Sequence, residues 1–172
     1  SGEILLNGQK IRFKHPQMAV EQGIFLVPEE RRTQGLHIED TVKENIVLPF
    51  LQRFTFASWV LSQRENTYST EVVEKSGILA PSIHTPVENL SGGNQQKIAL
   101  AKWLSANCQV IILDEPTRGV DVGAKVEIYN LINELAASGL AIIVISSELV
   151  EVIGICDRIM VMRDGRAQGF LD

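Results

Sequence analysis

The sequence lacks three features that would assign a class of protein at once. Only two of its 172 residues are cysteine, Cys108 and Cys156, and they form no CxxC pattern. We therefore expect free, buried thiols in a reducing compartment rather than a disulfide framework or a zinc site. No apolar run approaches the roughly 20 residues that a membrane-spanning helix needs. Any association with a membrane is therefore expected to depend on a partner.

The third missing feature is a basic surface. The chain has 16 Lys and Arg residues against 21 Asp and Glu residues, a formal net charge of -5, and its basic residues are scattered. Binding to nucleic acid needs a basic stripe that displaces counterions from phosphates, so we expect no nucleic-acid partner. What the chain does have is 45% hydrophobic residues. That content is enough for the core of one globular domain.

The strand pattern is strongest toward the two ends of the chain. Residues 24–27 predict a short strand, and three later runs are apolar on both faces: residues 110–113, 141–145 and 158–162. Strands of that kind are usually central and parallel. The dipeptides Asn7-Gly8 and Asp164-Gly165 predict turns of β-hairpins. The ends of the chain therefore predict an α/β sheet.

Helices are predicted between these strands. A short helix is expected to begin at Pro16 and to stop at Gly23, and a longer one to end at Gly139. The longer helix is amphipathic, and its expected buried face consists of Val122, Val126, Tyr129, Ile132 and Leu135. It would join two parallel strands in a β-α-β unit.

The middle of the chain differs from its ends. Residues 40–106 contain the helix-like runs DTVKENIVL, STEVVEKSGI and GGNQQKIALAKWLSA, and almost no strand pattern. We therefore predict that residues 1–39 and 107–172 form an α/β core and that residues 40–106 form a helical subdomain. The last of the three helices is expected to run to Ala106.

The first residues with clear chemistry are Asp114 and Glu115, directly after the apolar run 110–113. Open α/β sheets bind ligands at the carboxyl ends of their parallel strands. One acid can hold Mg²⁺ through water, while its neighbour, which points the other way along the strand, polarises an attacking water. The alternative is a solvated strand end followed by a turn, and the acid pair alone leaves that open.

The second group is Ser91, Gly92 and Gly93, at the start of a predicted helix. Ser91 is a suitable N-cap, and the glycines let a ligand approach the backbone closely. Free N–H groups and the positive end of the helix dipole would suit an anion there. The alternative is an ordinary capped surface helix.

Together, the two groups resemble the nucleotide-binding domain of ABC transporters. The run LSGG at residues 90–93, a helix, the run VIILDEPT and then Asp121 follow one another in that family's order. The resemblance covers essentially the whole chain. It implies an α/β, P-loop NTPase-like ABC ATPase fold with a mostly parallel central sheet and an inserted helical subdomain.

The same motifs imply roles for single residues. Glu115 stands in the place of the family's catalytic base, and Asp114 in the place of a magnesium ligand. Five residues would contact the nucleotide: Ser91, Gly92, Gly93, Asn94 and Asp121.

Three longer runs narrow the resemblance. LVPEERRTQGL, LSGGNQQK and VISSELVEV are similar to the C-terminal ATPase half of the fused importers for ribose, xylose, galactosides or related furanosyl compounds. This similarity implies ATP and Mg²⁺ as cofactors and hydrolysis coupled to transport. The implied partners are a second ABC ATPase half, membrane-spanning permease subunits and, indirectly, a periplasmic sugar-binding protein. The implied location is peripheral, on the cytoplasmic face of the inner membrane.

Three positions depart from the common pattern of the family. Glu29 stands where most relatives have the Q-loop glutamine, and it can still reach a metal or water, so we include it as a metal ligand. Asn94 replaces a glutamine. Ser147 occupies the place of the switch histidine, and a serine does not titrate near neutral pH. We include Ser147 as a catalytic position, and we expect slow hydrolysis or none at the site it lines.

A phosphate loop of the form GxxxxGK[ST] does not occur in the 172 residues. Such a loop wraps a phosphate in backbone N–H groups. In the family it precedes a hairpin like SGEILLNGQKI, so we expect the chain to be a fragment, truncated at the N-terminus and inactive alone. We also expect an exposed sheet edge that favours self-association.

Two alternatives remain open from the sequence. The aromatic residues Phe50, Phe54, Phe56 and Trp59 would form the core of the helical subdomain, or border a groove for a coupling helix of the membrane subunit. The chain as a whole would be part of an ATP-hydrolysing motor, or of a non-catalytic nucleotide-binding or regulatory ABC-type module. The charged run EERR at residues 29–32 is interpreted as solvated, apart from Glu29.

Overall fold

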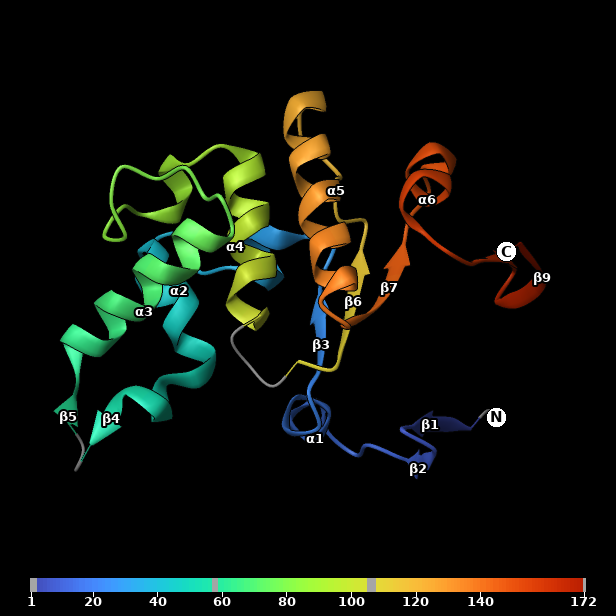
Figure 1. The fold of residues 1–172 in the computed structure, drawn as a ribbon, viewed down its shortest axis with the longest axis horizontal. Helices are drawn as coiled ribbons and strands as arrows, with labels where there is room; N and C mark the ends of the chain where they lie inside the picture. Colours follow the sequence, from blue (N-terminus) through green and yellow to red (C-terminus); the bar gives the residue numbers. More distant parts are fainter. Residues whose placement is uncertain (1–2, 57–58, 105–107, 172) are drawn as a thin grey trace.

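A parallel three-stranded sheet lies at the centre of the computed structural model, which describes residues 3–56, 59–104 and 108–171 (Figure 1). Its strands are β3 (Ile24–Val27), β6 (Val110–Asp114) and β7 (Ala141–Ile145), in the order β3-β6-β7. Both strand pairs are parallel. The expected parallel arrangement is therefore confirmed for two of the three runs that are apolar on both faces, and residues 24–27 form the third strand of this sheet.

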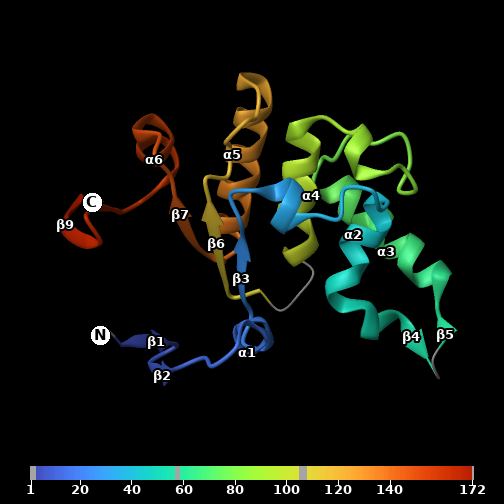
Figure 2. The same cartoon turned by 180° about the vertical axis from the view of Figure 1, so that it is seen from behind.

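One face of the sheet is covered by helices α4 (Gly92–Leu104) and α5 (Val122–Ala137), as Figures 1 and 2 show from opposite sides. Strand alternation turns Phe25, Ile111 and Leu113 to this face, where they are buried. Leu26 and Ile143 are about half exposed. The core therefore lies between the sheet and these two helices and continues to Val42 and Ile46, and β7 is an edge strand in the described part of the chain.

Helix α5 confirms the predicted β-α-β unit, and its buried face includes the predicted Ile132 but not Val122 or Val126. Its buried residues are Ile128, Leu131 and Ile132. Val122 and Val126, which were expected on the buried face, are 81% and 54% exposed. The helix is apolar around much of its circumference, so the periodicity of its sequence did not determine which side meets the sheet.

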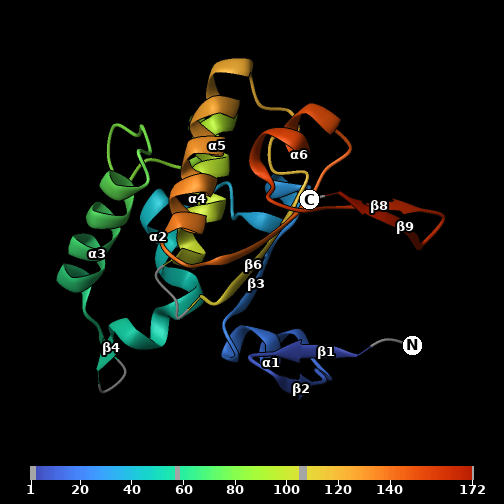
Figure 3. The ribbon, with the colours of Figure 1, turned by 45° about the vertical axis from the view of Figure 1, so that its right-hand side comes forward.

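The last apolar run, residues 158–162, is not a central parallel strand, so that prediction was wrong. It forms β8 (Ile159–Arg163), which pairs in antiparallel fashion with β9 (Arg166–Leu171) as a separate hairpin (Figure 3). Asp164 and Gly165 at its turn have positive φ, as predicted. The physical reason is local: a tight turn pairs β8 with its sequence neighbour, and Met160 and Met162 are about half exposed.

The first hairpin and the first helix match the sequence. Strands β1 (Ile4–Leu6) and β2 (Gln9–Ile11) pair across Asn7 and Gly8, which both have positive φ. Helix α1 (Pro16–Glu21) ends shortly before Gly23, whose φ is 74°. The other short elements are η1, a π-helix (Arg31–Gly35), η3 (Val87–Asn89) and α6 (Leu149–Ile155).

Residues 40–106 contain α2 (Val42–Val47), η2 (Leu48–Phe54), α3 (Ser62–Lys75) and α4. They also contain two short strands, β4 (Thr55–Phe56) and β5 (Trp59–Val60), that the sequence did not predict. Helix α4 ends at Leu104, and the expected end at Ala106 falls outside the described residues. Helix α4 contacts α2 and α3 as well as α5, so it joins the helical region to the sheet.

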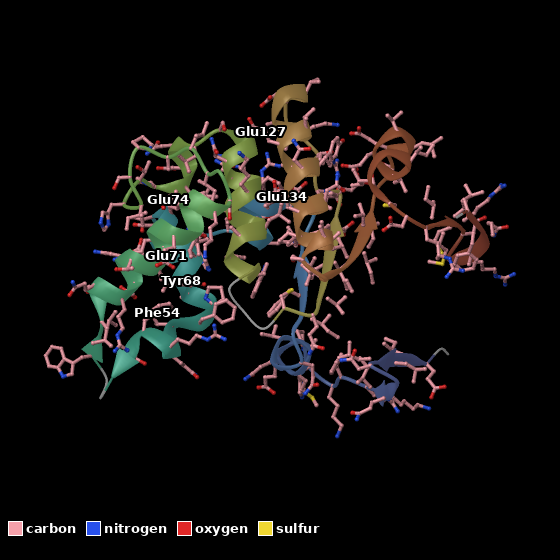
Figure 4. All side chains as sticks on the ribbon, in the orientation of Figure 1. Phe54, Tyr68, Glu71, Glu74, Glu127 and Glu134 are labelled. Carbon is pink, nitrogen blue, oxygen red and sulfur yellow. The ribbon has the colours of Figure 1, made fainter. Side chains whose placement is uncertain are left out.

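The aromatic residues of the middle region divide between two clusters. Phe50 lies edge-on to Phe25 and to Trp103, and those two rings stack at 4.8 Å. Phe54 contacts Tyr68 on α3 at 5.1 Å between ring centroids (Figure 4). Trp59 is 78% exposed, so it is not part of the expected core. The side chain of Phe56 lies outside the described residues.

Both cysteines are free, as expected, and half-buried rather than buried. Burial raises the pKa of the Cys108 thiol to about 11 and raises the pKa of Cys156 as well. No helix in the described ranges is long and apolar enough to cross a membrane.

Candidate functional site

Glu115 occupies an unusual backbone position at the carboxyl end of β6. Its φ is 46°, in the left-handed region that side chains other than glycine rarely adopt. Its N–H donates to the Ile145 carbonyl at 2.8 Å, and its Oε1 accepts a hydrogen bond from the Ser147 N–H at 2.9 Å. The two residues predicted to be catalytic therefore meet at the same edge of the sheet. Strain of this kind is common where a side chain must be held in one place.

Asp114 and Glu29 differ in how well they suit a metal ion. Asp114 is the last residue of β6, and one carboxylate together with water is a suitable ligand set for Mg²⁺. Glu29 forms an ion pair with Arg118, so it could bind a metal only if that pair opened. Among the described residues, no group of three or more His, Cys, Asp or Glu side chains is placed to hold a metal. Asp114 thus fits Mg²⁺ better than Glu29 does.

The start of α4 has the predicted cap. Ser91 Oγ accepts hydrogen bonds from the Asn94 N–H at 3.3 Å and from Asn94 Nδ2 at 3.0 Å. Asn94 Oδ1 accepts from the Leu79 N–H at 2.8 Å. The Asn94 side chain thereby ties the loop before α4 to the cap, while Ser91 itself is exposed.

Packing requires glycine at position 93, and Gly92 lies against the flexible end of the Arg31 side chain. A Cβ at Gly93 would lie 2.6 Å from the Ala124 Cβ, and a Cβ at Gly92 would lie 2.9 Å from Arg31 Nη2. Asp121 caps α5 by accepting from the Ala124 N–H at 2.9 Å. The starts of α4 and α5 therefore touch, and this contact brings the LSGG residues beside Asp121. The sequence had suggested only a ligand as the reason for the glycines.

The site thus has two groups of predicted residues. Glu115 and Ser147 form one, and residues 91–94 with Asp121 form the other. The loop 115–121 connects them, because it begins at Glu115 and ends at Asp121.

Sequence reasoning missed one of the residues that hold this loop. Arg31 was interpreted as part of a solvated charge run, but it is half-buried, and that interpretation was wrong. Its Nη1 donates to the Arg118 carbonyl at 2.8 Å and its Nη2 to the Gly119 carbonyl at 3.3 Å. Burial lowers the pKa of the guanidinium. Its partners lie 87 and 88 residues away in the chain, so no local pattern could have found them.

A second missed contact holds α6 to the same loop. The Thr117 hydroxyl donates to Glu151 Oε1 at 2.8 Å, and both residues are buried. Glu148, at the start of α6, binds Lys125 of α5 through both carboxylate oxygens, at 2.6 and 2.7 Å. The threonine of the DEPT run therefore has a structural partner that its motif did not reveal.

This combination of sheet, acid pair and capped glycine helix agrees with the family comparison. Residues 1–118 match the ABC transporter family, and the chain belongs to that family. Solved ATP-binding cassettes share its fold. One is a dimeric cassette in a post-hydrolysis state bound to ADP and Pi, with a TM-score of 0.78 and 21% identity over 99% of this chain and 73% of that one. Another is the ADP conformation of a cassette of an ABC transporter, with a TM-score of 0.79 and 24% identity over 99% of this chain and 68% of that one.

Curated relatives are more similar in sequence. The ribose import ATP-binding protein RbsA of Geobacillus kaustophilus is 48% identical over 99% of this chain and 35% of its own length. A putative ribose/galactose/methyl galactoside import ATP-binding protein of Halalkalibacterium halodurans is also 48% identical, over 99% of this chain and 33% of its own length. The chain therefore spans about a third of the length of these relatives.

Proposed function

We propose that the chain is part of the ATP-hydrolysing motor of an ABC importer for a monosaccharide or a related furanosyl compound. It would act within a protein of its relatives' length, and alone it would be inactive. The observation that supports this most is the fixed Glu115 carboxylate beside Asp114 at the carboxyl end of β6. An acid held in that way can orient and activate a water molecule for attack on a phosphate.

The proposal assigns the residues as follows. Glu115 takes the proton of the attacking water, and Asp114 would hold Mg²⁺, which when bound neutralises phosphate charge. Glu29 remains a second metal ligand in this proposal, on condition that its ion pair with Arg118 opens. The nucleotide contacts are Ser91, Gly92, Gly93, Asn94 and Asp121, which would face an ATP held on the other ATPase half.

Ser147 has a supporting role in this proposal. Its backbone N–H, rather than its side chain, contacts the Glu115 carboxylate. A backbone donor can be supplied by any residue except proline, so the position tolerates the loss of the histidine for this contact. A serine cannot place a positive charge near a γ-phosphate, which supports slow turnover at the site it lines.

The proposed assembly has four parts. Residues 1–39 and 107–172 form the core and residues 40–106 the helical subdomain of one ATPase half, and a second half pairs with it. Permease subunits cross the membrane, and a periplasmic sugar-binding protein delivers the substrate. The ATPase would be peripheral, on the cytoplasmic face of the inner membrane.

A second candidate is a non-catalytic nucleotide-binding or regulatory module. The observation that favours it is that Ser147 takes the switch position and its N–H engages the Glu115 carboxylate. A regulatory module would bind ATP with the same rate and affinity whether or not the sugar is present.

The ATPase rate of the full-length protein, measured in vesicles together with its permease, distinguishes the two candidate functions. We expect the rate to rise several-fold when the sugar-loaded binding protein is added, because closure of the two halves is coupled to transport. ATP binding without such a response would favour the regulatory module. Absence of ATP binding would contradict both candidates.

A further inference from the structure

Two arginines cross-link two chain connections that run side by side at the carboxyl end of the sheet. One connection leads from β3 into η1, and the other is the loop 115–121 after β6. Arg31 of the first donates to the carbonyls of Arg118 and Gly119 in the second, and Arg118 of the second forms an ion pair with Glu29 of the first. The link is reciprocal, so each connection restrains the other.

The Arg31 guanidinium also touches the start of α4. A Cβ on Gly92 would lie 2.9 Å from Arg31 Nη2 and 3.4 Å from the Gly119 carbonyl oxygen. The Arg31 Nε is buried and without a hydrogen-bond partner. Three segments, η1, the loop 115–121 and the α4 start, therefore meet at this one side chain.

We infer that Arg31 is a positioning residue that fixes the loop 115–121 against the start of α4. Its planar fork reaches two adjacent carbonyls at once, and hydrogen bonds from a charged donor are stronger than neutral ones. Through this loop it sets how Glu115 and Asp121 lie relative to Ser91. The restraint itself is independent of the proposed ATPase function; its effect on turnover rests on that function.

Hydrogen exchange in the full-length protein tests the restraint directly. The amides of Arg118 and Val120 are hydrogen-bonded to the carbonyls of Glu115 and Thr117, at 3.1 and 3.2 Å, and report on opening of the loop. With Arg31→Ala, we expect exchange in peptides covering residues 115–121 to rise roughly tenfold, while distant peptides of the sheet are unchanged.

The matched control is Arg32→Ala, because Arg32 is the neighbouring arginine and its side chain is exposed. Arg32→Ala should leave exchange in residues 115–121 as it is. Arg31→Lys, which keeps the charge but loses the fork, should give an intermediate rise, and it replaces Arg31→Ala if that variant does not fold. Equal exchange in the Arg31 and Arg32 variants would overturn the inference.

A double-mutant cycle tests the contact with α4. Gly92→Ala should be destabilising while Arg31 is present, because its methyl group displaces the guanidinium from the Arg118 and Gly119 carbonyls, and it should be less so in the Arg31→Ala background. Additive effects of the two substitutions would show that Arg31 does not pack on Gly92.

The consequence for turnover is measured on the same variants. We expect Arg31→Ala to lower kcat for ATP hydrolysis by about tenfold or more while the KM for ATP stays within about threefold, because loop placement rather than binding is lost. If the unsubstituted full-length protein has no ATPase activity, the proposed function fails, while the exchange experiment still decides the role of Arg31. If kcat and KM changed in proportion in both Arg31→Ala and Arg32→Ala, Arg31 would not be a positioning residue.

Discussion

Gly93 shows how closely the candidate site depends on helix packing. Gly93→Ala would place a methyl group 2.6 Å from the Ala124 Cβ, which is closer than two carbon atoms can approach. We expect it to lower the free energy of unfolding by about 1–3 kcal/mol, the usual cost of overpacking. Ala124→Gly in the same chain should restore most of the loss. Urea unfolding of the two variants measures both effects.

Gly123→Ala is the matched control for this pair. A Cβ there would meet only Asp121 Oδ1, at the ordinary distance of 3.5 Å. It should therefore be neutral or slightly stabilising in the helix. A Gly93→Ala variant as stable as the Gly123→Ala variant would mean that the starts of α4 and α5 are not in contact.

Lys102 gives the stability of the chain a pH dependence. Burial lowers its pKa to about 8 from 10.5, and its Nζ donates to the Gly35 carbonyl. The unfolded state therefore binds more protons than the folded state between those two values, and stability rises with pH across that window. Cys108 acts in the opposite direction above pH 9, because burial raises its pKa from 9.0 to about 11.

The Lys102 effect should therefore be visible as a rise in Tm between roughly pH 7.5 and 9. Lys102→Met keeps an apolar stem without the amine, so its Tm should rise less over this range. Lys125→Met is the control, since the hydrogen bond to Glu148 raises rather than lowers the pKa of Lys125. If Tm depended on pH in the same way in all three proteins, burial would not lower the pKa of the Lys102 amine.

At the scale of single residues, part of the site could be predicted from the sequence. The cap at Ser91 and the meeting of Glu115 with position 147 follow from local motifs and from the family resemblance. Arg31 could not be found, because its partners are backbone carbonyls distant in sequence. Every residue has a backbone carbonyl, so no residue type in the sequence marks the partner of Arg31.

Among the elements, α6 is attached through a buried polar contact. The Thr117 hydroxyl donates to Glu151 Oε1, and the two residues are 1% and 3% exposed. Thr117→Val keeps the shape and removes the donor, which leaves a buried carboxylate without this partner. We expect the free energy of unfolding to fall by about 1–3 kcal/mol.

Thr117→Ser keeps the hydroxyl and should lose much less stability than Thr117→Val. Both variants can be compared by urea unfolding, with hydrogen exchange across α6 as a local report. Equal stability of the valine and serine variants would show that the hydroxyl contributes nothing to holding α6.

The elements themselves were predicted with unequal success. Predictions of turns from strong local signals were confirmed, such as the hairpin at Asn7-Gly8. Predictions that depended on a distant partner or on a choice of face failed: β8 does not join the parallel sheet, and α5 turns Ile128 inward instead of Val126. An apolar run predicts that a strand or helix is buried, but tertiary packing determines which element it packs against.

At the scale of the whole molecule, the 172 residues contain no GxxxxGK[ST] loop. The two carboxylates at the end of β6 would repel a polyphosphate that has no such anchor. We expect the isolated chain to show no measurable ATPase and a Tm shift below about 1 °C with millimolar MgATP, since stabilisation follows the ratio of ligand concentration to Kd. The full-length protein should shift clearly. A clear rise in the Tm of the isolated chain with MgATP would show that residues of this chain bind the phosphates without such a loop.

In the proposed motor, the Glu115 carboxylate activates water for ATP hydrolysis. This role is tested most directly by the ATPase rate and ATP affinity of the full-length protein with Glu115→Gln, beside Glu148→Gln, a nearby acid that binds Lys125. We predict that Glu115→Gln lowers the rate by about a hundredfold or more, with ATP affinity within about threefold, while Glu148→Gln changes the rate by less than about threefold. A Glu115→Gln protein that hydrolyses ATP at the unsubstituted rate would contradict this role of Glu115.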